Sequence, residues 1–151
     1  MGYPTYPNYS QNNQQNSAYY QRIKVETATP EALVLMLYDG ALKFMTQAEL
    51  AFEEKNIEKI SNLLIKVQAI FSELHASLDK EKGGDIATNL ERLYIFFNSR
   101  LAEANMKKDV KPMLEIRPLV QNLRDSWEGA MHKHQSSQQV VPPRPRLNFS
   151  A

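Results

Sequence analysis

Residues 28–45 read ATPEALVLMLYDGALKFM, and this stretch decides the fold class. It begins as helices do, because Thr29 can cap the first turn and Pro30 suits the first helical position. The residues that follow are apolar on nearly every side, although a surface helix needs only one apolar stripe. The stretch therefore predicts a helix with more apolar surface than one packing face can use.

Three further segments have the spacing of amphipathic helices. In residues 57–78 the apolar positions alternate three and four apart for three heptads, which is typical of a bundle helix. Residues 85–107 and 109–131 repeat the pattern, and no segment alternates as a strand does. With a first helix over 30–55, the chain predicts an all-α fold, an antiparallel up-down four-helix bundle with helices about 30 Å long.

The expected core consists of one inward stripe from each helix. Its members are Val34, Leu37, Ala41, Phe44, Met45, Ala48 and Phe52; Ile57, Ile60, Leu64, Val67, Phe71, Leu74 and Leu78; Ile86, Leu90, Leu93, Phe97, Leu101 and Ala104; and Met113, Ile116, Val120, Leu123, Trp127 and Ala130.

Glycine and proline interrupt this pattern at three places. Gly83 and Gly84 predict a break before the third helix. Pro118 either kinks the fourth helix or marks its regular start near Arg117, and the sequence leaves both open. Gly40 fits either a second backbone passing close to the first helix or direct packing against the second or fourth helix.

Two tails flank the expected domain of residues 19–135. Residues 1–18 are rich in Gln, Asn and Tyr, and residues 136–151 are rich in proline, so both are predicted to be disordered. The segment Pro142–Arg146 favours polyproline II, which suits either a peptide ligand or a solvated tail.

Composition excludes several function classes. Lys and Arg number 18 against 17 Asp and Glu, which argues against a nucleic-acid partner held by phosphate contacts. No apolar run reaches the roughly 18 residues of a membrane span, so membrane insertion is not expected. The chain has no cysteine and its first residues lack the features of a signal peptide, which together favour a cytoplasmic location.

Catalytic motifs are absent from the sequence. It has no phosphate-binding glycine loop, no nucleophile elbow and no zinc-protease motif. His132 and His134 would point to different faces of a helix and make a poor chelate, and Asp79 and Asp85 suit a turn and an N-cap better than a catalytic pair. We expect no enzyme activity, no cofactor and no metal site.

A surplus of apolar residues points away from the inward stripes. At about 100° per residue, the outward or flanking positions are Leu35, Met36, Leu50, Ile65, Ile95 and Phe96. Burial against extra neighbours explains Leu35 and Met36 equally well if the first helix is central. The others predict a surface that binds amphipathic segments of a partner.

Several short motifs together resemble the FliS family of flagellar secretion chaperones. They are Ala28-Thr29-Pro30, the run from Leu35 to Ala41, Ala104-Asn105 with Lys107-Lys108-Asp109, and Leu123-Arg124 with Trp127. The resemblance covers about Tyr19 to His132. The longer tails and Pro118 depart from the family pattern.

The resemblance implies a non-catalytic helical bundle in the bacterial cytoplasm. It implies binding of the disordered C-terminal segment of flagellin, which would prevent premature polymerisation and keep flagellin ready for the flagellar type III export apparatus. It also implies that the segment 19–28 covers part of the binding surface, with Tyr19, Tyr20, Ile23 and Val25 as its apolar contacts.

A second hypothesis is a structural or signalling bundle that associates with its own copy. The same outward apolar residues would then form a homodimer, weak or otherwise, when no partner is present. Size-exclusion chromatography with and without flagellin separates the two, since only the chaperone should shift to a complex.

Overall fold

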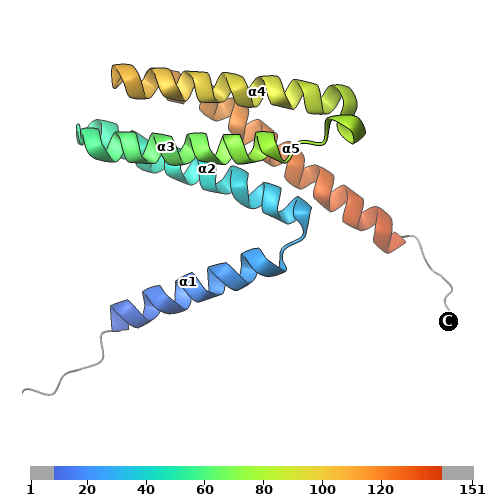
Figure 1. Cartoon of the computed structure of the whole chain (residues 1–151). Helices are drawn as coiled ribbons and strands as arrows, with labels where there is room; N and C mark the ends of the chain where they lie inside the picture. The colour runs from blue at the N-terminus through green and yellow to red at the C-terminus, as the bar shows by residue number, and fades with distance from the viewer. Residues whose placement is uncertain (1–8, 141–151) are drawn as a thin grey trace, which may run out of the picture. The chain divides into compact units, whose positions relative to one another are not determined.

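The computed structural model describes the backbone of residues 9–140 and the side chains of residues 17–135. Over that range it has no strand and five helices: α1 (Tyr9–Thr27), α2 (Pro30–Glu53), α3 (Ile57–Ala76), α4 (Lys80–Lys107) and α5 (Lys111–Val140) (Figure 1). The all-α class is confirmed. The chain divides into two units, one up to Leu33 and one from Val34 onward, and each is described by itself.

The number of helices differs from the expected four because of α1. This helix begins at Tyr9, inside the segment expected to be disordered, and residues 1–8 lie outside the described range. No proline or glycine interrupts Tyr9–Thr27, and its glutamines and alanine have good helix propensity. The prediction of disorder considered only how little apolar surface this stretch can bury.

Side-chain caps define where the other helices begin. The Thr29 hydroxyl accepts from the Ala32 N–H at 3.1 Å, which confirms the expected cap of α2. Asn56 caps α3, and Asp79 caps α4 by accepting from two backbone N–H groups. Asp109 accepts from the Lys111 N–H at 3.0 Å at the start of α5. These bonds satisfy N–H groups that the first turn leaves free.

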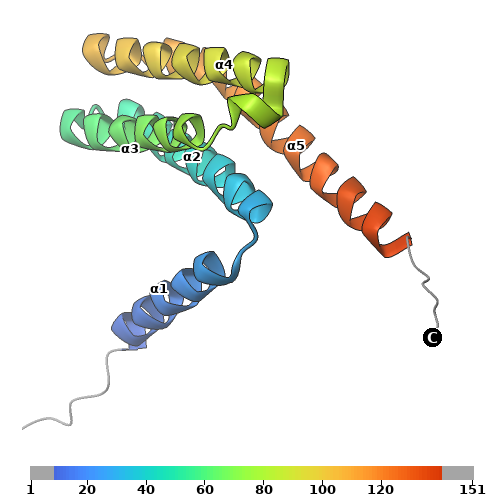
Figure 2. The ribbon, with the colours of Figure 1, turned by 45° about the vertical axis from the view of Figure 1, so that its right-hand side comes forward.

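Helices α2 to α5 contribute to one hydrophobic core. Its fully buried members include Leu64 and Phe71, as the spacing predicts. The Phe71 ring lies 5.0 Å from that of Phe97 and 6.1 Å from that of Tyr94, measured between centroids. Both views show α3 and α4 side by side (Figures 1 and 2).

Three residues assigned to the inward stripes are exposed instead. Ile57 is the first residue of α3, and Ala130 lies in the second half of α5, so neighbouring helices cover neither. Ile86 is 72% exposed and follows a kink at Gly84, which shifts the helical phase. Regular spacing does not predict such end effects.

The core also holds a polar pair, Tyr38 of α2 and Tyr94 of α4. Their hydroxyl oxygens lie 2.5 Å apart, and each residue is only 2% exposed. Burial raises the pKa of both phenols, because the charged form loses its hydration. The spacing of both residues matches the inward stripes, so their burial could have been predicted from the sequence. The expected core omitted them and took apolar side chains only at these stripes.

The glycine pair lies inside α4 and not before it. The helix begins at Lys80, five residues before the expected start, and Gly84 interrupts it with φ 52° and ψ −129°, a conformation that suits glycine. A Cβ on Gly83 would lie 2.7 Å from the Cβ of Ala87, so a side chain has no room there. The predicted break is therefore present as a kink within the helix.

The structure also decides between the alternatives that the sequence left open at Pro118 and Gly40. Pro118 lies within α5, which starts at Lys111 and runs to Val140, past the expected end near residue 131 and into the expected tail. A start at Arg117 is wrong, and residues 141–151 lie outside the described range. A Cβ on Gly40 would meet Ile70 Cδ1 of α3 at 3.4 Å, which supports direct helix packing at this glycine.

Leu64→Ala and Phe71→Ala should each lower the free energy of unfolding by about 2–5 kcal/mol, because each leaves a cavity in the core. Urea melts measure this loss. Ile65→Ala is the matched control, since Ile65 follows Leu64 but is exposed, and it should change stability by less than about 1 kcal/mol. An equally small loss for Leu64→Ala would mean that this seam is not the core.

Tyr38→Phe and Tyr94→Phe should each cost about 1–3 kcal/mol, because each leaves a buried hydroxyl unpaired. The double variant should cost clearly less than the sum, since it removes both hydroxyls together. A double-mutant cycle from urea melts measures the coupling, and strictly additive losses would contradict the hydrogen bond.

Candidate partner-binding surface

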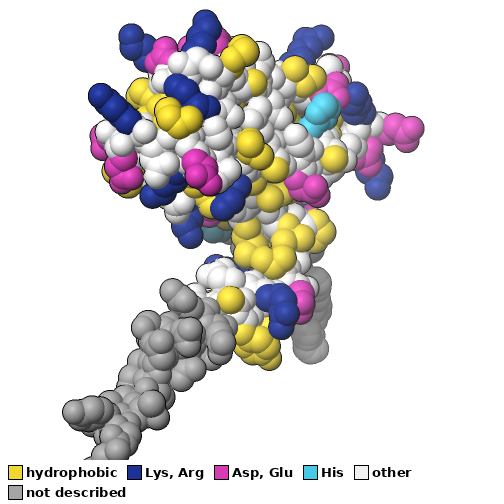
Figure 3. Space-filling model, turned by 60° about the vertical axis from the view of Figure 1, so that its left-hand side comes forward, with side chains coloured by type: hydrophobic (Ala, Val, Ile, Leu, Met, Phe, Trp, Pro, Cys, Tyr) yellow, Lys and Arg dark blue, Asp and Glu magenta, His cyan; other side chains and the backbone are white. Residues whose placement is uncertain are grey.

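The outward sides of α3 and α4 carry large apolar side chains. Ile65 of α3 and Ile95 of α4 are each 55% exposed, and Phe96 is 38% exposed. Figure 3 shows one face of the molecule, where hydrophobic side chains reach the surface between charged ones. The expected exposure of these three residues is confirmed, and their role in binding stays a prediction.

A hydrogen bond between α3 and α4 indicates on which side of the helices Ile65 and Ile95 lie. Gln68 Nε2 donates to the Asn98 carbonyl oxygen at 3.4 Å across the seam between α3 and α4. Ile65 precedes Gln68 by three residues, and Ile95 precedes Asn98 by three. Residues three apart share a helix face, so both isoleucines lie on the side of the helices that carries this polar contact.

Further polar contacts extend along the same seam. Ser61 donates to Asn105 Oδ1 at 3.0 Å, and Asn98 Nδ2 donates to Ser72 Oγ at 3.2 Å. Most polar groups of the seam therefore have partners within the chain, although Asn98 Oδ1 is buried without one among the described residues. The isoleucines are the groups on this face that gain most from being covered.

The predicted outward residues of α2 are less uniform. Leu50 is exposed. Leu35 and Met36 are half-buried, so they are neither fully outward nor part of the core. The role of all six residues in partner binding stays a prediction.

The predicted cap residues lie on α1. Tyr19, Tyr20, Ile23 and Val25 are all exposed. Arg22 lies over the Tyr19 ring at 5.9 Å from its centroid, and Thr27 Oγ1 donates to the Ile23 carbonyl oxygen at 2.9 Å. The segment is thus helical, whereas the sequence indicated a lead-in too short to fold alone.

The structure also shows an apolar groove that the sequence did not indicate. It has a volume of about 320 Å³ and lies where α3 passes into α4, and we call it the corner groove. Its lining comprises Val34, Tyr38, Leu74, Ser77, Leu78, Asp79, Lys82, Gly83, Ile86, Ala87, Leu90, Tyr94 and Trp127. The one signal for it in the sequence was the glycine pair, because the kink at Gly84 brings the first turn of α4 into the groove wall.

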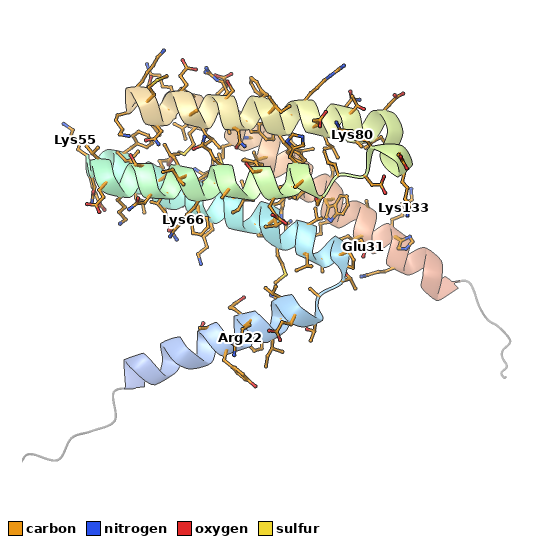
Figure 4. The ribbon with its side chains drawn as sticks, in the orientation of Figure 1. Arg22, Glu31, Lys55, Lys66, Lys80 and Lys133 are labelled. Carbon is orange, nitrogen blue, oxygen red and sulfur yellow. The ribbon has the colours of Figure 1, made fainter. Side chains whose placement is uncertain are left out.

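A small charge cluster lies at the same corner. Glu91 Oε2 is 2.7 Å from both Lys80 Nζ and His75 Nε2, and Figure 4 places Lys80 where α3 passes into α4. Hydrogen bonds from Lys80 and then His75 hold the pKa of Glu91 below its usual value. Such solvated ion pairs stabilise little, so this cluster adds little to the stability of the bundle.

The described side chains offer no group of three or more His, Cys, Asp or Glu that could hold a metal ion. Within the same part of the chain, no helix is long and apolar enough to cross a membrane. What the geometry does offer is exposed apolar surface on a closed bundle, which suits binding of another polypeptide.

Known proteins are similar to this chain in sequence. The model of a family described as "Flagellar protein FliS" matches residues 11–134, which include most of α1 and nearly all of the bundle. The chain belongs to the FliS family. The FliS match begins earlier than the resemblance at Tyr19 suggested.

Curated FliS relatives span most of the chain. It is 37% identical over 112 residues to the flagellar secretion chaperone FliS of Bacillus subtilis (strain 168), covering 74% of this chain and 83% of the relative. It is 36% identical over 114 residues to the flagellar secretion chaperone FliS of Salmonella typhimurium, covering 72% and 84%. The flagellar secretion chaperone FliSB of Pseudomonas aeruginosa is 34% identical over 117 residues, covering 75% and 93%. These relatives are named as chaperones, which is a non-enzymatic role.

Proposed function

We propose that this protein is a cytoplasmic chaperone for flagellin. It binds the C-terminal segment of flagellin while that segment is disordered, prevents premature polymerisation, and keeps the subunit ready for the flagellar type III export apparatus. The observation that carries the proposal is the exposure of Ile65, Ile95 and Phe96 on a bundle whose core is already filled by other residues.

The physical basis is the burial of apolar surface shared between two chains. A disordered segment loses conformational entropy when it is ordered. Burial of a large apolar surface must offset this loss for the segment to bind. The bundle supplies such a surface without rearranging its own core. The reaction needs no bond to be made or broken, so it requires no catalytic residue and no cofactor.

The antiparallel order of α2 to α5 belongs to this proposal. Cross-helix bonds support it, because Ser61, Gln68 and His75 of α3 pair with Asn105, Asn98 and Glu91 of α4, in falling order. Arg117 and Arg124 of α5 likewise pair with Glu49 and Asp39 of α2. The result is a rigid platform with its outer face available for binding.

Ile65→Asp and Ile95→Asp should each weaken binding of a flagellin C-terminal peptide by about tenfold or more, since losing one apolar contact is worth at least about 1.4 kcal/mol. Isothermal titration measures the dissociation constant. Urea melts should change by less than about 1 kcal/mol, because both residues are exposed.

Asn89→Asp is the matched control for this experiment. Asn89 is exposed on α4 and lies about 120° around the helix from Ile95, at about 100° per residue. It adds the same carboxylate and should leave binding unchanged. Unchanged binding by both isoleucine variants would refute the assignment of this face, and unfolding of either would show that the residue belongs to the core.

We also propose that the segment containing α1 covers part of the binding surface until flagellin displaces it. The exposed Tyr19, Tyr20, Ile23 and Val25 support this, because each would gain from being covered. The apparent affinity for flagellin then falls by the fraction of time the surface is closed.

Deleting residues 1–25 should therefore tighten binding of the flagellin C-terminal peptide. Isothermal titration of the peptide against the full and shortened chains gives the sign of the change. Weaker binding by the shortened chain would mean that the segment contacts flagellin directly, and equal binding would mean that it is an inert linker.

A further inference from the structure

Lys108 follows α4 in a backbone conformation that is unfavourable for a residue with a side chain. Its φ of 51° and ψ of 47° are left-handed, and glycine is the residue that most often ends a helix in this way. Such strain persists where other contacts offset it. We propose that Lys108 is a positioning residue, which holds α3 and α4 in the register that presents Ile65 and Ile95 together. The inference rests on the function proposed above.

The Lys108 ammonium has an acceptor for each of its three N–H donors. It donates to Ser61 Oγ of α3 at 2.8 Å, to the Asn105 carbonyl oxygen at 2.8 Å, and to Asn105 Oδ1. Ser61 Oγ in turn donates to Asn105 Oδ1 at 3.0 Å. The ammonium therefore reinforces a bond between two helices, and hydrogen bonds from a charged donor are stronger than those between neutral groups.

This bond is the first of three polar pairs along the seam between α3 and α4. The pairs are Ser61 with Asn105, Gln68 with the Asn98 carbonyl oxygen, and His75 with Glu91. Successive pairs are seven residues apart on both helices, so a shift of one helical turn would break all three together. Apolar stripes that repeat every three or four residues discriminate less between such registers, and polar groups at a helix seam are well suited to specify one.

The two isoleucines lie between these polar pairs. Ile65 lies between the first and second pairs on α3, and Ile95 lies between the second and third pairs on α4. A shift of one turn would move one isoleucine by about 5.4 Å relative to the other. A partner segment that contacts both side chains in the native register would then lose one of these contacts.

The first pair is the one best suited to hold the register. The second pair has a donor–acceptor distance of 3.4 Å, which is longer than most N–H···O bonds. The third pair, His75 with Glu91, is partly solvated and therefore stabilises little. Ser61, Asn105 and Lys108 are all half-buried, so water competes less for their bonds.

Lys55, after the end of α2, is a matched control within the same chain. Lys55 and Lys108 are the two residues other than glycine with positive φ in the part of the chain that the structure describes, and the φ of Lys55 is 57°. Lys55 is exposed, and its side chain extends away from the helices (Figure 4). It therefore has a similar backbone strain without the hydrogen bonds of the Lys108 ammonium.

Urea melts of Lys55→Gly and Lys108→Gly in the full chain separate strain from side-chain bonding. Lys55→Gly removes only the strain, so it should lower the equilibrium constant of unfolding by about threefold. Lys108→Gly removes the strain and the ammonium together, so it should give no gain in stability, or a loss. Equal gains in the two variants would overturn the proposal, because the ammonium would then contribute nothing.

Binding distinguishes positioning from stability alone. Isothermal titration of a flagellin C-terminal peptide should show binding at least about threefold weaker for Lys108→Gly, as expected if the native register is held for about a third of the time. Lys55→Gly should bind as the native chain does. Ser61→Ala removes the same link from α3 without altering the end of α4, and it should weaken binding to a similar extent.

The double variant Ser61→Ala with Lys108→Gly should bind no more weakly than the weaker single variant, because both changes break one link. Unchanged binding by both single variants, or fully additive losses in the double variant, would overturn the proposal.

Methyl NMR of the free, isoleucine-labelled protein reports the register without flagellin. The Ile95 signal is decisive because Ile95 precedes Lys108 by thirteen residues, about 20 Å of helix. This signal should shift or divide in Lys108→Gly and Ser61→Ala and stay in place in Lys55→Gly. An unchanged Ile95 signal in the first two variants would overturn the proposal. If the native chain fails to bind the peptide while these shifts occur, the proposed function is wrong and the positioning of α3 against α4 by Lys108 stands.

Discussion

A helix in a four-helix core can bury only one stripe of its surface, and the rest of this structure depends on that limit. Helices α2 to α5 fill the core from such stripes, with Leu64, Phe71 and Phe97 fully buried. Apolar residues off the stripes have no place inside. Ile65 and Ile95 are therefore exposed in a bundle that is already closed, and exposed apolar surface of this kind is what a partner segment can cover.

Two local features give the bundle its specific shape. The buried bond between Tyr38 and Tyr94 joins α2 to α4 and penalises arrangements that leave either hydroxyl unpaired. The kink at Gly84 turns the first part of α4, and it thereby creates the corner groove. The first feature holds the platform in one arrangement, and the second adds an apolar groove that regular helices would not have.

Much of this structure follows from the sequence because helical periodicity has one dominant physical cause, the burial of one face. It predicted the buried Leu64 and Phe71, and it predicted the exposed Ile65 and Ile95. Periodicity could not predict the exposure of Ile86, because the kink at Gly84 rotates the residues before it relative to those after it. The spacing of apolar residues does not give the size of this rotation. The corner groove was missed for a related reason, since it arises from residues far apart in the sequence.

The central claim is that residues outside the core bind the flagellin segment while the core stays unchanged. Methyl NMR of isoleucine-labelled protein tests this most directly, because Ile65 and Ile95 are exposed while Ile60 and Ile116 are buried in the same bundle. On adding a flagellin C-terminal peptide, we expect the methyl signals of Ile65 and Ile95 to shift and those of Ile60 and Ile116 to stay in place. Shifts at Ile60 and Ile116 without shifts at Ile65 and Ile95 would contradict the claim.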